Sequence, residues 1–122
     1  MKKRILIIDD EERIREIYKR YFNAVGASVF EIIETGNARE ATEYIIREPV
    51  DIIILDIEMP GVDGRVMFEI IKEYNPDLKV IVASVYPIDQ QKRLIPFALD
   101  YFDKSQGIMK LLAKVSHVLA EA

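Results

Sequence analysis

Acidic residues follow two short apolar segments of the chain. Asp9 and Asp10 come directly after residues 5–8, and Asp56 comes directly after residues 52–55. Continuous apolar runs of this length are typical of parallel strands that are buried on both faces. Carboxylates about 4 Å apart repel each other by roughly 4 kcal/mol per pair at an effective dielectric near 20. Three carboxylates at neighbouring strand ends therefore indicate a cation that neutralises them.

A hydroxyl and an ammonium group follow two further predicted strands, at Ser84 and Lys104. Oxygen ligands without histidine or cysteine favour Mg²⁺ or a similar ion such as Mn²⁺. A metal ion, a lysine and a hydroxyl around one carboxylate are typical of phosphoryl transfer, and a carboxylate nucleophile there would form an acyl phosphate. Taken singly, Asp9, Asp10 and Asp56 could serve a helix dipole or a turn, and Lys104 could be a surface charge. Their combination favours the phosphoryl site.

The elements that must position these residues alternate along the chain. Apolar runs predict strands at residues 5–8, 29–33, 52–55, 78–83 and 101–102, and helical spacing predicts helices at 14–25, 38–45, 67–74, 89–97 and 108–119. Asn37 and Glu40 form the pattern of a capping box before the second helix. Such alternation predicts an open α/β sheet of parallel strands with helices on both faces, and ligands bind at the carboxyl ends of its strands.

The composition limits the kind of protein. A chain of 122 residues fits one domain over 1–122, and the absence of cysteine excludes disulfides and thiolate sites. The net charge of −4 argues against binding of nucleic acid through a basic face. The first apolar run is too short for a secretory signal or a membrane span, so we expect a cytoplasmic location without membrane contact.

The chain resembles the receiver domains of two-component response regulators, the CheY-like family of chemotaxis and phosphorelay proteins. Four segments carry the resemblance: Ile-Leu-Ile-Ile-Asp-Asp-Glu at 5–11, Asp-Ile-Ile-Ile-Leu-Asp-Ile-Glu-Met-Pro-Gly-Val-Asp-Gly at 51–64, Val-Ile-Val-Ala-Ser at 80–84 and Asp-Tyr-Phe-Asp-Lys at 100–104. The resemblance implies a flavodoxin-like sheet with strand order 2-1-3-4-5. It also implies that a histidine kinase or histidine phosphotransfer protein phosphorylates Asp56, which then changes binding to a downstream protein or a fused effector domain.

The resemblance assigns roles to the other site residues. Asp10 and Asp56 would ligate the metal directly together with the backbone carbonyl of Glu58, and Asp9 would act through water. Such a domain catalyses its own phosphorylation and dephosphorylation but is otherwise not an enzyme. The residues that would bind the phosphoryl group or respond to it are Lys104, Ser84 and Tyr101.

Three departures from the family pattern concern the output side. Ser105 stands where the family usually has proline, so we expect a trans Lys104–Ser105 peptide, a lysine that still points toward Asp56, and a Ser105 hydroxyl that caps the last helix. The segment from Ser84 to Lys104 is shorter than usual, which predicts an abbreviated fourth helix. Residues 96–99 (Pro-Phe-Ala-Leu) replace the usual small residues before the last strand.

Two other interpretations stay open. A pseudo-receiver would bind partners without phosphorylation, and a small phosphatase would use Asp56 as a transient nucleophile with Glu58 nearby. The chain is short for a phosphatase, and its complete set of acids argues against a pseudo-receiver. The sequence is compatible both with a stand-alone regulator and with a receiver taken from a longer protein.

Overall fold

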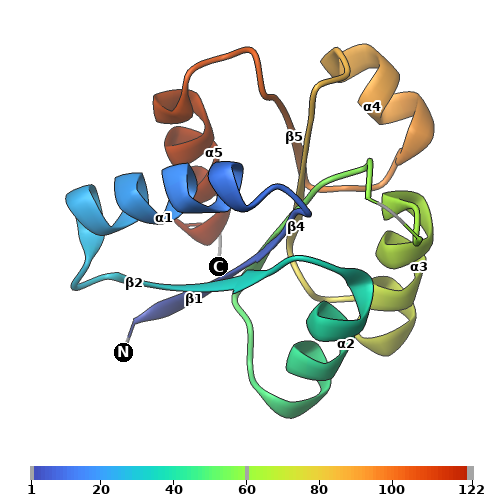
Figure 1. Ribbon diagram of the computed structural model, residues 1–122, viewed down its shortest axis with the longest axis horizontal. Coiled ribbons are helices and arrows are strands. Elements are labelled where there is room, and N and C mark those ends of the chain that lie inside the picture. The colour runs from blue at the N-terminus through green and yellow to red at the C-terminus, as the bar shows by residue number, and fades with distance from the viewer. Residues whose placement is uncertain (1, 60, 121–122) are drawn as a thin grey trace.

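The computed structural model describes residues 2–59 and 61–120, so Pro60 of the predicted turn and the ends of the predicted 1–122 domain lie outside the described residues. Five parallel strands form one sheet in the order β2-β1-β3-β4-β5, which confirms the predicted flavodoxin-like fold (Figure 1). The strands are β1 (Lys3–Ile8), β2 (Phe30–Thr35), β3 (Ile52–Leu55), β4 (Val80–Ser84) and β5 (Asp100–Asp103). The helices are α1 (Glu12–Gly26), α2 (Ala38–Arg47), α3 (Gly64–Tyr74), α4 (Ile88–Leu94) and α5 (Ile108–Ala120).

Helices cover both faces of the sheet because its central strands are apolar on both sides. The four residues of β3 are all buried, and alternate residues pack into two separate cores. One core joins the sheet to α2, α3 and the region of α4, and the other joins it to α1 and α5 (Figure 1). None of the described helices is long and apolar enough to cross a membrane.

The capping box predicted at the start of α2 is present. The side chain of Asn37 accepts a hydrogen bond from Glu40 N at 2.9 Å, and the Glu40 carboxylate accepts one from Gly36 N at 3.2 Å. The first bond satisfies a backbone donor that the first helical turn leaves without a partner, and the second binds the Glu40 side chain to Gly36, the residue before the N-cap. The helix therefore begins where the sequence pattern predicts.

The segment after β4 differs from the prediction at two points. Helix α4 is shorter than the expected 89–97 and ends at Leu94, as the abbreviated connection suggests. The prediction that Ser105 caps the last helix is wrong, because α5 begins at Ile108. Ser105 instead donates its backbone N–H to the Asp103 carboxylate at 2.8 Å, so it belongs to a turn between β5 and α5.

Candidate functional site

The register between β1 and β3 places two of the predicted acids side by side. Ile8 pairs with Leu55, so the residues that follow, Asp9 and Asp56, leave the sheet at the same level. The backbone N–H of Asp56 still donates to the Ile8 carbonyl at 2.9 Å, which extends the ladder by one bond. The two side chains are buried, with exposed fractions of 2% for Asp9 and 4% for Asp56.

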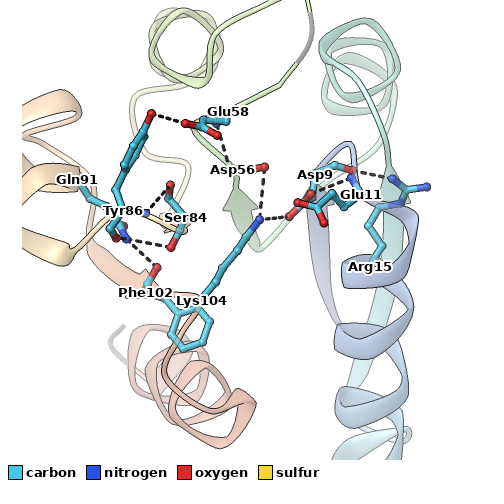
Figure 2. Close-up of polar contacts among 10 residues, drawn as sticks. All are labelled: Asp9, Glu11, Arg15, Asp56, Glu58, Ser84, Tyr86, Gln91, Phe102 and Lys104. Atoms are coloured by element: carbon cyan, nitrogen blue, oxygen red, sulfur yellow. Dashed lines mark hydrogen bonds and ion pairs between the residues drawn. The ribbon is translucent and has the colours of Figure 1, made fainter.

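Strands β4 and β5 bring the lysine to the same edge of the sheet. Ser84 pairs with Asp103, and the next residue, Lys104, donates its backbone N–H to the Ser84 carbonyl at 2.8 Å. The Lys104 Nζ lies 2.8 Å from Asp9 Oδ2 and 3.4 Å from Asp56 Oδ2 (Figure 2). One ammonium group therefore bridges the ends of three strands.

The acids and the lysine border an open cavity of about 530 Å³, lined among others by Asp10, Asp56, Glu58 and Lys104. Asp10 is exposed at its rim, whereas Asp9 is buried beneath it. One carboxylate oxygen from each of Asp9, Asp10 and Asp56 lies within 4.8 Å of the other two. The predicted acids thus converge with the spacing and the all-oxygen chemistry that suit a hard divalent cation.

Burial and neighbouring charges shift the titration of the central pair. Burial raises the pKa of Asp56 to about 7, because the attraction of Lys104 only partly offsets desolvation and the repulsion from Asp9. Burial opposes the charged form of Lys104, yet its hydrogen bond to Asp9 and the attraction of Asp56 raise its pKa above the ordinary value. The site without metal therefore holds less negative charge near pH 7 than three free carboxylates would.

The chain at the start of α3 must approach the end of β3 closely. A Cβ atom on Gly64 would collide with the backbone of Asp56 and Ile57, whereas Gly64 N donates to the Ile57 carbonyl at 2.8 Å. Asp63 caps the helix by accepting from Arg65 N at 2.8 Å. Glycine at this position thus allows the helix to pack directly beside the predicted phosphorylation site.

The peptide bond after the lysine has the predicted form. No cis peptide bond occurs among the described residues, so the Lys104–Ser105 bond is trans. The Lys104 side chain nevertheless reaches Asp56 and Asp9, as expected from its long stem. Serine in place of proline leaves the lysine directed at the acids.

Neither Ser84 nor Tyr101 is among the described residues that line the cavity, and the two lie in different surroundings. Ser84 is completely buried, and its Oγ accepts from Tyr86 N at 3.3 Å. Tyr101 is 6% exposed; its hydroxyl donates to the Ile95 carbonyl and accepts from Ala98 N at 3.2 Å. The tyrosine is thus held inside the protein, under the segment between α4 and β5. Its predicted role as a switch stays a prediction.

Three residues that the sequence reasoning missed support the site (Figure 2). Tyr86 donates its hydroxyl proton to the Glu58 carboxylate and so joins the loops after β3 and β4. Arg15 of α1 donates to the backbone carbonyl of Asp9 at 2.6 Å. Gln91 of α4 is completely buried and contacts both β4 and β5. A usable signal existed for Gln91, since it lies three residues after Ile88 and four before Ile95, on the apolar face of its helix.

Comparison with known proteins agrees with this arrangement. The chain is 30% identical over 123 residues to sporulation initiation phosphotransferase F of Bacillus subtilis, covering 98% of this chain and 95% of that protein. It is 33% identical to the response regulator GtcR of Aneurinibacillus migulanus over 100% of this chain, but spans only 50% of that protein. The relatives therefore include both proteins of about this length and proteins twice as long.

Solved structures show the same fold. The response regulator TrrA from Thermotoga maritima, in complex with Mg²⁺ and BeF, is 34% identical, with a TM-score of 0.85 over 95% of this chain and 98% of that one. A CheY-like receiver domain protein from Methanospirillum hungatei is 26% identical, with a TM-score of 0.89 over 99% and 96% of the two chains. The family model of the response regulator receiver domain matches residues 5–116. The chain belongs to the response regulator receiver domain family.

Proposed function

We propose that this receiver domain accepts a phosphoryl group on Asp56, with Mg²⁺ or Mn²⁺ bound at the adjacent acids. The observation that carries the proposal is the contact of Lys104 Nζ with Asp56 Oδ2 at 3.4 Å, on the border of an open cavity. The buried carboxylate of Asp56 provides the nucleophile, and the ammonium of Lys104 provides a positive charge that offsets the negative charge of the incoming phosphoryl oxygens. The reacting carboxylate is thus held at the base of a site that a donor can reach.

The donor set fits the proposed metal ion. Asp9, Asp10 and Asp56 supply carboxylate oxygens within one small region, and the backbone carbonyl of Glu58 is proposed as a further ligand. Mg²⁺ and Mn²⁺ prefer such oxygen ligands and commonly bind phosphate as well. When bound, the metal would neutralise charge on the acids and on the phosphoryl oxygens. The complex of TrrA with Mg²⁺ and BeF, at 34% identity, supports this assignment.

The transfer itself uses side chains of this chain. A carboxylate oxygen of Asp56 attacks phosphorus, the bond from phosphorus to the donor histidine nitrogen breaks, and the imidazole leaves with the electron pair. Lys104, now bridging Asp9 and Asp56, moves its ammonium to a phosphoryl oxygen. Ser84 donates a hydrogen bond to another oxygen from the end of β4. The product is an acyl phosphate on Asp56.

Receiver domains of response regulators interact with histidine kinases or phosphotransfer proteins and with effector domains, and we propose the same kinds of partner here, in the cytoplasm. The phosphotransferase relative of nearly equal length supports a phosphorelay role, and the relatives of twice the length support a fused effector. The domain would act as a phosphoacceptor and not as an enzyme that turns over free phosphoesters. Direct contact with nucleic acid is not part of the proposal, given the net charge of −4.

Incubation of the purified protein with acetyl phosphate and Mg²⁺ is expected to add one phosphoryl group, detected by intact-mass spectrometry. A chelator should prevent the addition, because the acids repel the donor when no cation neutralises them. Asp10→Asn should raise the Mg²⁺ concentration for half-maximal labelling at least about tenfold, because it weakens one ligand at the rim. Labelling that is unchanged by the chelator and by Asp10→Asn would contradict the metal site.

Ser84→Ala is expected to leave labelling within a few-fold of wild type but to weaken the conformational response. The hydroxyl of Ser84 is proposed to move toward a phosphoryl oxygen, and the space it leaves lets Tyr101 repack. NMR chemical-shift changes on α4, β5 and α5 upon addition of Mg²⁺ and beryllofluoride should therefore be clearly smaller in the variant. Full-sized changes at these elements in Ser84→Ala would refute the coupling.

A further inference from the structure

Gln91 has polar contacts that its place in a short surface helix does not require. Its side chain is completely buried, and its Nε2 donates to the carbonyls of Tyr86 at 2.7 Å, Phe102 at 2.9 Å and Ser84 at 3.4 Å (Figure 2). Its Oε1 is also buried and has no partner among the described residues. The three carbonyls fix the orientation of the amide, because only its nitrogen end carries donors.

The three carbonyls belong to the segments that carry the proposed phosphoryl-binding residues. Phe102 belongs to β5 and lies two residues before Lys104. The Ser84 carbonyl also accepts a hydrogen bond from the backbone N–H of Lys104, at 2.8 Å. Tyr86 donates its own N–H to the Ser84 Oγ. One amide group therefore joins the end of β4, the loop after it, and the end of β5.

Strand β5 needs such a tie more than the other strands do. It has four residues, it lies at the edge of the sheet, and among the described strands it pairs with β4 alone. A short edge strand has ladder bonds on one side only, so additional contacts decide how firmly its end is held. Because Lys104 directly follows β5, any movement of that strand moves the base of the lysine side chain.

We infer that Gln91 is a positioning residue for phosphoryl transfer, which holds Lys104 and Ser84 in place by tying the ends of β4 and β5 to α4. The inference rests on the function proposed above. Gln91 does not face the cavity, so it acts through the two residues that would contact the phosphoryl group. A misplacement of about 1 Å in such a group slows a reaction by up to roughly a hundredfold.

The test replaces Gln91 with methionine, which has a similar shape but no donor. With acetyl phosphate and saturating Mg²⁺, Gln91→Met is expected to lower the maximal labelling rate roughly tenfold or more, within the range for a misplaced reacting group. Gln90→Met, the same change at the preceding and partly exposed position, should label like wild type. Val118→Ala truncates a core residue of α5 and serves as a destabilised control with normal labelling.

A double-mutant cycle separates positioning from general damage. Loss of the Ser84 hydroxyl alone is expected to change labelling by no more than a few-fold, so most of the effect of Gln91 should pass through the lysine. Gln91→Met should therefore change the rate by no more than a few-fold once Lys104→Ala has removed the ammonium. Fully additive losses, or a wild-type rate in Gln91→Met, would overturn the inference. If Gln91→Met does not fold, Gln91→Asn replaces it, since the shorter amide keeps its donors but cannot reach all three carbonyls. Absence of labelling in the wild-type protein would instead overturn the proposed function.

Discussion

Replacing Asp56 with asparagine is expected to abolish phosphoryl labelling by acetyl phosphate while leaving the fold intact. The amide is nearly the same size as the carboxylate but is a poor nucleophile and a weaker metal ligand. Among the described acids that line the cavity, Asp56 is the one in direct contact with Lys104. Asp9 also contacts the lysine, at 2.8 Å, but does not line the cavity. Intact-mass spectrometry with acetyl phosphate and Mg²⁺ measures the loss.

Asp63→Asn provides the matched control for this experiment. Asp63 lines the same cavity and caps α3, and asparagine is an equally good cap, so this variant should label like wild type. Labelling of Asp56→Asn at the wild-type level would show that another residue accepts the phosphoryl group. Peptide mapping of the labelled protein would then identify it.

The sequence was sufficient to predict the edge of the sheet at which the site lies. Polar residues directly follow the apolar runs at Asp9, Asp56 and Ser84, and Lys104 lies two residues after the last run. Parallel strands bring their carboxyl ends to one edge, so the convergence of these residues follows from topology alone. The sequence did not predict which of the two neighbouring acids is exposed. In the structure Asp10 is exposed, whereas Asp9 is buried and contacts Lys104.

The sequence does not predict contacts between two segments when neither segment carries a local pattern that points to the other. The bond from Tyr86 to Glu58 joins two loops, and neither loop contains a signal for the other. Ser105 illustrates competition between local motifs: its backbone N–H bonds to the Asp103 side chain, and this turn delays the start of α5. Gln91 is polar and therefore looks like a surface residue, although its spacing from Ile88 and Ile95 places it on the inner face.

The burial of Asp56 has a consequence for stability that can be separated from its proposed chemistry. The folded protein binds a proton at Asp56 more tightly than the unfolded chain does, because its pKa is raised from 3.8 to about 7. Protonated Asp56 therefore stabilises the fold fully below about pH 4, and this contribution is lost as the pH rises through 7. The rise of the pKa corresponds to a decrease of roughly 4 kcal/mol in the free energy of unfolding of the metal-free protein once the pH is above 7.

Asp56→Asn should therefore be more stable than wild type at pH 8 in the presence of a chelator, by up to roughly 4 kcal/mol in the free energy of unfolding. Asparagine does not ionise, so the advantage should shrink as the pH falls and nearly vanish near pH 4. Lys104 keeps its partner Asp9 in the variant, which prevents a new unpaired charge from hiding the effect. Urea denaturation of both proteins across this pH range measures the difference.

Magnesium provides the decisive comparison for this prediction. Binding to the folded wild-type protein at about a hundred times the dissociation constant adds about 2.7 kcal/mol of stability, and Asp56→Asn should gain much less because it has lost a charged ligand. The stability gap at pH 8 should therefore narrow when Mg²⁺ replaces the chelator. A gap that does not change with pH would show that Asp56 is already ionised in the folded protein at acidic pH. A stability gap that changes with pH but not with Mg²⁺ would confirm that Asp56 is buried and contradict the metal site. The pH dependence comes from the burial of Asp56, whereas the Mg²⁺ dependence requires that the oxygens of Asp9, Asp10 and Asp56 bind an ion together.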